Sequence, residues 1–252
     1  PLVERLGDRA GDLSGGQQQM LGLAMAFLNP PSLLLVDELA LGLAPVVVEQ
    51  LLPTVRDLSE KGTTVVIVEQ SVNTALSLAE TAYFMEKGQI RFHGPTSALL
   101  DRPEMLRSVF LEGVTAGLAG SGRPPEKVKP RVVSDDSEIS GRDRVPVLTA
   151  SGMSRTFGGI KAVDKVSLSI DKGEILGLIG PNGAGKTTLF DLICGFTASE
   201  SGSVAIEGRS LDGKTPAERS RMGLGRSFQD ARLFPSLTVL ETLAVALDRW
   251  TR

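Results

Sequence analysis

The chain has 252 residues, a net charge of −3 and a hydrophobic content of 41%. That length and composition allow one large or two small domains with a hydrophobic core, and the net charge gives no general reason to expect nucleic-acid binding. The single cysteine, Cys194, excludes an intrachain disulfide framework and fits a reducing compartment. Its place in an apolar run predicts a packed core thiol.

No stretch reaches the roughly 18 apolar residues that a membrane span needs, and no charged and then apolar leader opens the chain. Any membrane role is therefore expected to come through a partner. The chain begins at Pro1 rather than methionine and ends at Arg252. Both ends are interpreted as cuts inside a longer protein.

Residues 1–112 form a first block in which helical and strand patterns alternate. Two short apolar runs predict strands at 33–36 and 63–68. Residues 82–85 and 89–92, separated by a turn at 86–88, predict a hairpin. Helices are predicted at 17–28, 46–58, 71–79 and 97–111.

Residues 113–146 have a different character, with Gly, Pro, Ser and mixed charges and no aromatic residue. This composition cannot bury enough apolar surface to offset the entropy of ordering, so it predicts a flexible linker. As a random coil the segment would span on the order of 30 Å.

Residues 147–252 form the second block, with strands predicted at 148–153, 166–170 and 175–179. Strand and helix patterns alternate in both blocks. This alternation predicts an α/β fold with a largely parallel sheet flanked by helices.

A phosphate-binding loop follows the strand at 175–179, because Gly180-Pro-Asn-Gly-Ala-Gly-Lys-Thr-Thr188 has the G-x-x-x-x-G-K-T spacing. The glycines let backbone N–H groups surround a phosphate at the start of a helix. Lys186 is expected to reach the β- and γ-phosphates, and Thr187 to hold Mg²⁺. The nucleotide-binding residues predicted in this loop are Gly180, Asn182, Gly183, Ala184, Gly185, Lys186, Thr187 and Thr188.

A second anion site is predicted where Leu13-Ser14-Gly15-Gly16-Gln17 precedes a helix. A serine hydroxyl and glycine N–H groups at a helix N-terminus suit a γ-phosphate, although the same residues also suit a simple N-cap. An acidic pair, Asp37 and Glu38, ends the strand at 33–36. Taken alone, such a pair is also common at the start of a solvated loop.

Together these motifs resemble those of ATP-binding-cassette (ABC) ATPases, but here the back half of the family pattern precedes its front half. The resemblance implies ATP and Mg²⁺ as cofactors, and an ABC nucleotide-binding fold with an antiparallel β portion and a truncated helical subdomain. It implies that Ser14, Gly15, Gly16 and Gln17 face a γ-phosphate, that Asp37 binds Mg²⁺ through water and that Glu38 polarises the attacking water.

Two further positions match the family pattern, and one departs from it. Gln229, in Arg226-Ser-Phe-Gln229, corresponds to the Q-loop residue that contacts Mg²⁺ or water. Phe157 corresponds to the aromatic residue that stacks on adenine, with a core or edge-strand phenylalanine as the alternative. Gln70 stands where the family usually has a switch histidine. The only histidine, His93, is expected at the surface.

In finer detail the chain resembles the paired ATPases of branched-chain amino acid uptake transporters. Residues 37–45 and 68–70 resemble one member of the pair, and residues 157–163, 225–229 and 233–239 resemble the other. The implied partners are transmembrane permease subunits, a second ABC ATPase domain and, indirectly, a solute-binding protein. The implied location is the cytoplasmic face of the plasma membrane. No nucleic-acid partner is expected.

The reversed motif order has two explanations. In the first, the linker joins the end of one ATPase to the start of the next in a tandem polypeptide. In the second, the chain is one circularly permuted cassette. Because the apolar strands of each block need neighbours on both sides, we predict one sheet in which strands 33–36 and 175–179 are close neighbours and Asp37 lies near Thr187. The alternatives in function are a soluble ABC ATPase of translation or DNA repair and a nucleotide-binding regulatory module without turnover.

Overall fold

The structure is a computed structural model, and it describes residues 2–28, 30–37, 43, 45–69, 75, 77–102, 146–227 and 234–248. Three predicted site residues, Glu38, Gln70 and Gln229, lie outside the described residues, as do 113–145 of the predicted linker. None of the helices within the described ranges is long and apolar enough to cross a membrane.

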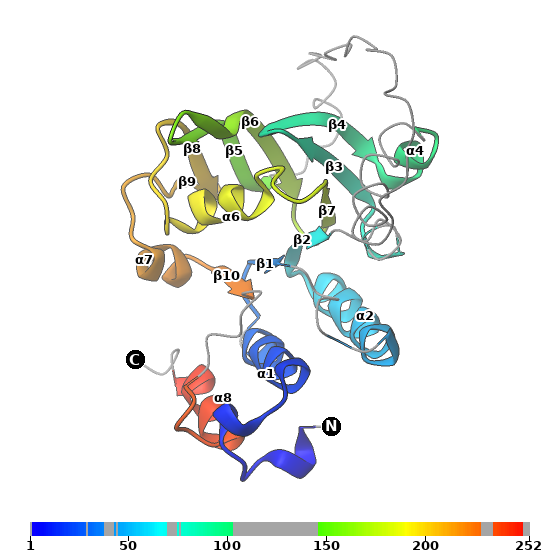
Figure 1. Ribbon diagram of the computed structural model, residues 1–252, viewed down its shortest axis with the longest axis vertical. Helices are drawn as coiled ribbons and strands as arrows, with labels where there is room; N and C mark the ends of the chain where they lie inside the picture. The colour runs from blue at the N-terminus through cyan, green and yellow to red at the C-terminus, as the bar shows by residue number, and fades with distance from the viewer. Residues whose placement is uncertain are drawn as a thin grey trace, which may run out of the picture.

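The described elements follow the predicted alternation of strands and helices (Figure 1). The strands are β1 Leu33–Asp37, β2 Thr64–Glu69, β3 Thr81–Glu86, β4 Gln89–Pro95, β5 Pro146–Phe157, β6 Ile160–Asp171, β7 Ile175–Ile179, β8 Ser201–Ile206, β9 Arg209–Ser210 and β10 Leu224–Ser227. The helices are α1 Gly15–Leu28, α2 Pro45–Glu60, α4 Thr96–Leu100, α6 Lys186–Cys194, α7 Pro216–Arg221 and α8 Val239–Asp248, with short 3₁₀ turns η1 Val3–Arg5 and η2 Ala10–Asp12.

One six-stranded sheet contains strands from both blocks, in the order β10-β1-β2-β7-β3-β4. All neighbouring pairs are parallel except β3 and β4, which form the predicted hairpin. Every residue of β1, β2 and β7 is buried, as expected for short apolar strands inside a parallel sheet. The prediction of one shared sheet is confirmed, since only β2 separates β1 from β7.

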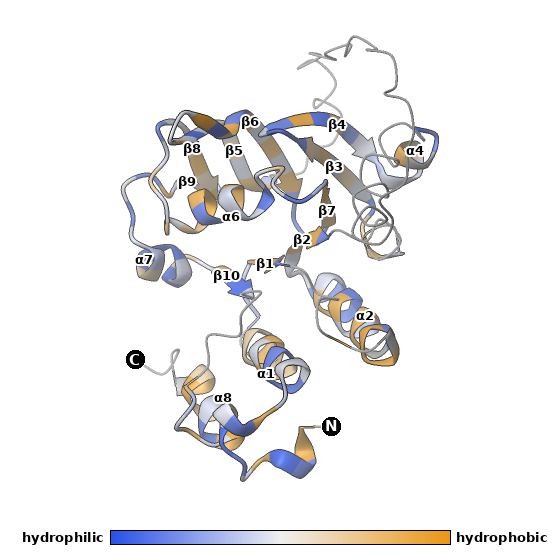
Figure 2. Ribbon diagram, in the orientation of Figure 1, coloured by the Kyte–Doolittle hydropathy of each residue, from blue (hydrophilic) through white to orange (hydrophobic). Residues whose placement is uncertain are grey.

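A second, antiparallel sheet has the order β6-β5-β8-β9 and confirms the expected antiparallel portion. It shares a hydrophobic core with the parallel sheet, in which Leu176 and Leu178 of β7 lie in one cluster with Leu148 and Ile170. Figure 2 shows hydrophobic colouring along many residues of these strands, whereas α7 is largely hydrophilic.

Helices α1 and α8 lie together at the end of the molecule far from the antiparallel sheet (Figure 1). Leu13 and Leu21 pack with Val239 in a small apolar cluster. Backbone hydrogen bonds complete the contact: the amide of Ala10 donates to the carbonyl of Leu237 over 2.8 Å, and that of Val239 donates to Asp8 over 2.9 Å. The helical part is therefore built from residues of both blocks.

Several element boundaries differ from those expected. Strand β5 begins at Pro146, inside the segment predicted as linker, because Val147 and Leu148 continue into the core. Helix α4 ends at Leu100 and Asp101 forms a turn, so the helix predicted at 97–111 is interrupted there; residues 103–111 of that prediction lie outside the described residues. The helix expected at 71–79 is described only in part. His93 is exposed, as expected, with its ring 4.4 Å from that of Tyr83.

Candidate nucleotide-binding site

The loop from Gly180 to Gly185 connects the buried strand β7 to helix α6, as the sequence predicts. Two of its glycines are required by close backbone approaches. A Cβ added at Gly180 would lie 2.0 Å from the carbonyl oxygen of Met85, and one at Gly185 would lie 2.0 Å from that of Ala162. Gly185 also has a φ of +102°. Only glycine fits either position, so the loop passes tightly between β3 and β6.

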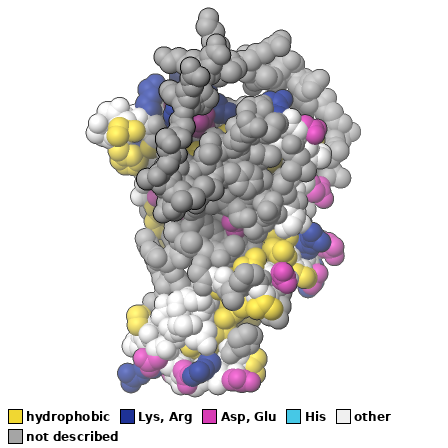
Figure 3. Space-filling view, turned by 45° about the vertical axis from the view of Figure 1, so that its right-hand side comes forward, with side chains coloured by type: hydrophobic (Ala, Val, Ile, Leu, Met, Phe, Trp, Pro, Cys, Tyr) yellow, Lys and Arg dark blue, Asp and Glu magenta, His cyan; other side chains and the backbone are white. Residues whose placement is uncertain are grey.

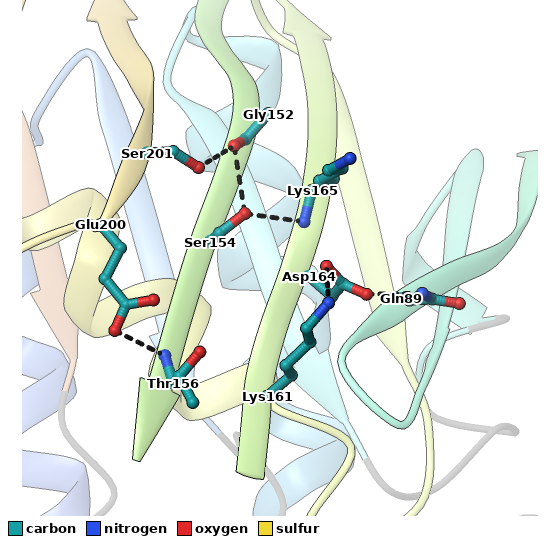
Figure 4. A network of polar contacts seen from close by, with 9 residues as sticks. All are labelled: Gln89, Gly152, Ser154, Thr156, Lys161, Asp164, Lys165, Glu200 and Ser201. Carbon is teal, nitrogen blue, oxygen red and sulfur yellow. Dashed lines mark hydrogen bonds and ion pairs between the residues drawn. The ribbon is translucent and has the colours of Figure 1, made fainter. Parts of the chain in front are cut away.

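A polar network attaches the β3–β4 turn to this loop and to β6. The amide of Gly88 donates to the carbonyl of Ala184 over 2.9 Å, and the amide of Asp164 donates to the carbonyl of Gly88 over 2.8 Å. The Gln89 side chain donates to Asp164 Oδ2 over 2.8 Å (Figure 4). This hydrogen bond, helped by Lys161, lowers the pKa of the Asp164 carboxyl. The first block therefore holds the phosphate loop of the second in place.

Lys186 begins helix α6 and is buried, with 5% of its surface exposed. Its ammonium donates to the carbonyls of Gly180 over 2.6 Å and Pro181 over 2.9 Å, so it lies over the loop. Thr187, the next residue, is exposed, as are Asn182 and Gly183. A cation over a glycine-rich loop at the N-terminus of a helix is an arrangement that attracts a phosphate group.

Asp37, the last residue of β1, is buried with 2% of its surface exposed. Its Oδ2 accepts a hydrogen bond of 3.1 Å from Arg226, whose second terminal nitrogen donates to Asp191 Oδ1 over 2.6 Å. Asp191 lies on α6, four residues after Thr187 in the sequence. Asp37 is thus connected through Arg226 to the helix that carries Lys186.

The donors present fit Mg²⁺ in a nucleotide complex. That ion prefers oxygen ligands and is usually held by one or two carboxylates together with substrate phosphates. The described residues offer the carboxylate of Asp37 and the hydroxyl of Thr187, both carried by elements that meet at one sheet. They contain no group of three or more His, Cys, Asp or Glu side chains of the kind that would hold a metal without a nucleotide.

The Ser14 to Gln17 segment forms an N-cap on α1. The Ser14 amide donates to Gln17 Oε1 over 3.0 Å, and the Gln17 amide donates to Ser14 Oγ over 3.4 Å. Ser14 and Gly15 are exposed, and nothing lies within 4 Å of a Cβ added at Gly15. Packing against the described residues therefore does not explain the glycine at position 15.

Phe157, at the end of β5, is 47% exposed, so it is not a core residue. The guanidinium of Arg155 lies 4.8 Å from the centre of its ring. An exposed aromatic ring with a cation against it is suited to stacking on a planar base.

Two arginines of the site have no role in the sequence-based interpretation. Arg226 lies on β10, within the motif that contains Gln229. Arg219 lies earlier in the chain, on α7. Arg219 donates to the carbonyls of Leu192 and Ile193 over 2.8 and 2.7 Å, at the C-terminal end of α6. The sequence signal that could have identified Arg226 is its position in the short strand β10, because an arginine buried in a strand is usually paired with a carboxylate.

Comparisons with known proteins agree with the motifs. Residues 163–252 match the family described as ABC transporter, and residues 9–69 match one described as AAA domain, putative AbiEii toxin, Type IV TA system. The High-affinity branched-chain amino acid transport ATP-binding protein BraG of Pseudomonas aeruginosa is 46% identical over 112 residues, which are 44% of this chain and 48% of that protein. The corresponding LivG of Salmonella typhimurium is 46% identical over 101 residues, 40% of each chain.

A third relative matches nearly the whole chain. The Probable multidrug ABC transporter ATP-binding protein YbhF of Escherichia coli is 26% identical over 300 residues, covering 96% of this chain and 51% of that protein. The chain thus spans about half of the length, or less, of the curated relatives it matches. Residues 163–252, which contain the phosphate loop, are therefore similar to the ABC transporter family, and the curated relatives that match the chain are ATP-binding proteins of such transporters.

Proposed function

We propose that the chain is an ATP-binding and ATP-hydrolysing component of an ABC importer for branched-chain or related amino acids. The observation that carries the proposal is that the phosphate-loop strand β7 and the strand that ends in Asp37 belong to one sheet. Lys186 and Asp37 can therefore serve a single nucleotide. The choice of solute is supported by the identities of 46% to BraG and LivG, which apply to less than half of the chain.

The roles of the residues follow from their chemistry. Lys186 and the loop 180–188 would bind the β- and γ-phosphates, and Phe157 would stack on the base. Thr187, Asp37 and Gln229 would hold Mg²⁺, which neutralises phosphate charge when it is bound. Glu38 would orient and deprotonate the attacking water, and Gln70 would sense the γ-phosphate through its amide. Glu38, Gln70 and Gln229 enter here from the sequence alone.

The start of α1 is assigned to a different nucleotide. Ser14 and Gly15 are exposed and Gly16 and Gln17 are partly exposed, which supports a role for these four residues facing the ATP of a second ABC domain. Permease subunits would couple the ATPases to transport at the cytoplasmic face of the plasma membrane, and a solute-binding protein would act indirectly, through those permease subunits.

On the face shown in Figure 3, described acidic and basic side chains lie intermixed among hydrophobic ones.

The reversed motif order fits a tandem protein. The single alignment with YbhF covers 96% of this chain and 51% of that protein, so that relative carries related sequence in the same order within a longer polypeptide. In a tandem polypeptide Ser14 would face the ATP on Lys186, and Glu38 and Gln70 would serve the opposite ATP. The single site proposed for this chain follows instead from its two blocks sharing one sheet. The packing of the two blocks into one sheet is how this chain, by itself, buries their apolar strands.

The test is transport by this protein together with its permease subunits, reconstituted in lipid vesicles. ATP-dependent accumulation of labelled leucine, abolished by Lys186→Ala, is the expected result. ATP-dependent movement of a hydrophobic drug without leucine uptake would contradict the proposed solute. ATP turnover stimulated by RNA or DNA would instead favour a soluble ABC ATPase.

A further inference from the structure

Arg226 connects the two blocks of the chain at the candidate metal site. It lies on β10, at the edge of the parallel sheet next to β1, and its side chain is 6% exposed. One terminal nitrogen donates to Asp37 Oδ2 over 3.1 Å and the other to Asp191 Oδ1 over 2.6 Å. A single planar guanidinium therefore joins the last residue of β1 to the middle of α6.

The surroundings of Arg226 hold the guanidinium in this position. It lies 5.8 Å from the ring centre of Phe190 and 5.9 Å from that of Phe196, both from the α6 region. Contact with aromatic rings and pairing with two carboxylates use the fork geometry of arginine, which a lysine ammonium cannot reproduce.

Arg219 provides a natural comparison because it also holds α6. Its guanidinium donates to the carbonyls of Leu192 and Ile193 at the end of the helix and to that of Lys214. These contacts fix the helix through its backbone. Arg226 instead contacts a side chain of the helix, the carboxylate of Asp191. Its other terminal nitrogen donates to Asp37.

We propose that Arg226 is a positioning residue for Mg²⁺. This proposal rests on the proposed binding of Mg²⁺-ATP, in which Asp37 on β1 and Thr187 on α6 must lie a fixed distance apart. Arg226 sets that spacing by joining Asp37 to the same helix through Asp191. Residues that orient metal ligands in this way typically change metal affinity about 10- to 100-fold when they are replaced.

The experiment measures thermal unfolding of the 252-residue chain at saturating ATP while Mg²⁺ is titrated, and separately ATP-induced stabilisation in EDTA. Arg226→Lys keeps the positive charge, but its ammonium can pair with only one of the two carboxylates. Asp191→Asn leaves Arg226 in place and removes the carboxylate that it contacts on α6. For both we expect the Mg²⁺ concentration at half-effect to rise about 5- to 10-fold, and for Arg226→Met about 10-fold or more. In EDTA, the ATP concentration at half-effect should change by less than about threefold, because ATP binding without Mg²⁺ depends on Lys186.

Arg219→Met is the matched control, since it loosens α6 without touching Asp37. It should lower the unfolding temperature yet leave the Mg²⁺ midpoint within about twofold of wild type. If Arg226→Met does not fold, Arg226→Lys and Asp191→Asn carry the test.

The proposal would be overturned if the Mg²⁺ midpoints of Arg226→Lys and Asp191→Asn match that of wild type, or if the Mg²⁺ midpoint of Arg226→Met is lower. Neither result would contradict ATP binding. A wild-type chain that ATP fails to stabilise at any Mg²⁺ concentration would overturn the proposed function as well.

Discussion

Asp37 and Arg226 are separated by 189 positions in the sequence, yet they form an ion pair of 3.1 Å between adjacent strands of one sheet. The pair crosses the boundary between the two blocks. Each block supplies part of the candidate nucleotide site: Asp37 comes from the first, and the phosphate loop comes from the second. This relationship explains why the chain can form a single site even though its motifs are in reversed order.

Lys186→Ala should abolish the stabilisation of the chain by ATP, because it removes the one fixed cation that the loop directs at the β- and γ-phosphates. Losing a charge-assisted contact worth about 1.5–3 kcal/mol lowers affinity roughly 10- to 100-fold. Thermal unfolding with and without ATP measures the effect. The exposed Lys172 supplies a matched control, since Lys172→Ala should retain the full shift. Equal ATP affinity in both variants would remove the phosphate-loop assignment.

Glu38→Gln should leave ATP bound in the intact transporter but slow its hydrolysis on the order of 100-fold or more, because an amide keeps the shape of the side chain and cannot accept the proton of the attacking water. Single-turnover hydrolysis measures this at one site, and the partner site need not change equally. Glu60→Gln, at the end of α2, is the control and should hydrolyse ATP at the wild-type rate. Wild-type turnover at both sites of Glu38→Gln would refute the role of Glu38.

Gly180→Ala should destabilise the fold by about 2–4 kcal/mol, because the new Cβ would lie 2.0 Å from the backbone carbonyl oxygen of Met85, which cannot move without disturbing β3. Urea unfolding of the chain measures the change. Gly7→Ala is the control, since nothing lies within 4 Å of a Cβ there. If both variants unfold at the same urea concentration, the close packing of the loop against β3 is wrong.

Burial raises the pKa of the Cys194 thiol from 9.0 to about 11. Since the folded pKa lies above the unfolded one, the associated stability is present below about pH 9 and is lost as pH rises towards 11. By pH 10 the loss should be roughly 1 kcal/mol.

The difference in unfolding free energy between wild type and Cys194→Ala, measured at pH 8 and pH 10, isolates this contribution from that of Tyr83, whose pKa burial raises to about 12. The folded thiol should also resist a disulfide reagent until the chain unfolds. Rapid labelling of Cys194 in the folded chain would show that the thiol is accessible and would contradict its burial.

The amino-acid sequence by itself determined the local parts of this protein. Spacing in Gly180–Thr188 defined the phosphate loop, because glycines, lysine and threonine must follow a strand and open a helix to hold a phosphate. The continuous apolar runs of β1, β2 and β7 predicted buried parallel strands because such residues need cover on both faces. Even the sharing of one sheet by the two blocks followed from that need.

Only the tertiary structure decided which distant groups meet. The strand order brings β10 beside β1, and this alone places the guanidinium of Arg226 between Asp37 and Asp191. Likewise, the carbonyl of Met85 forbids a side chain at Gly180, and the first block holds the loop of the second through Gly88. Local patterns carry no information on such contacts, because long-range pairing depends on how whole strands share a buried sheet rather than on the residues beside each position.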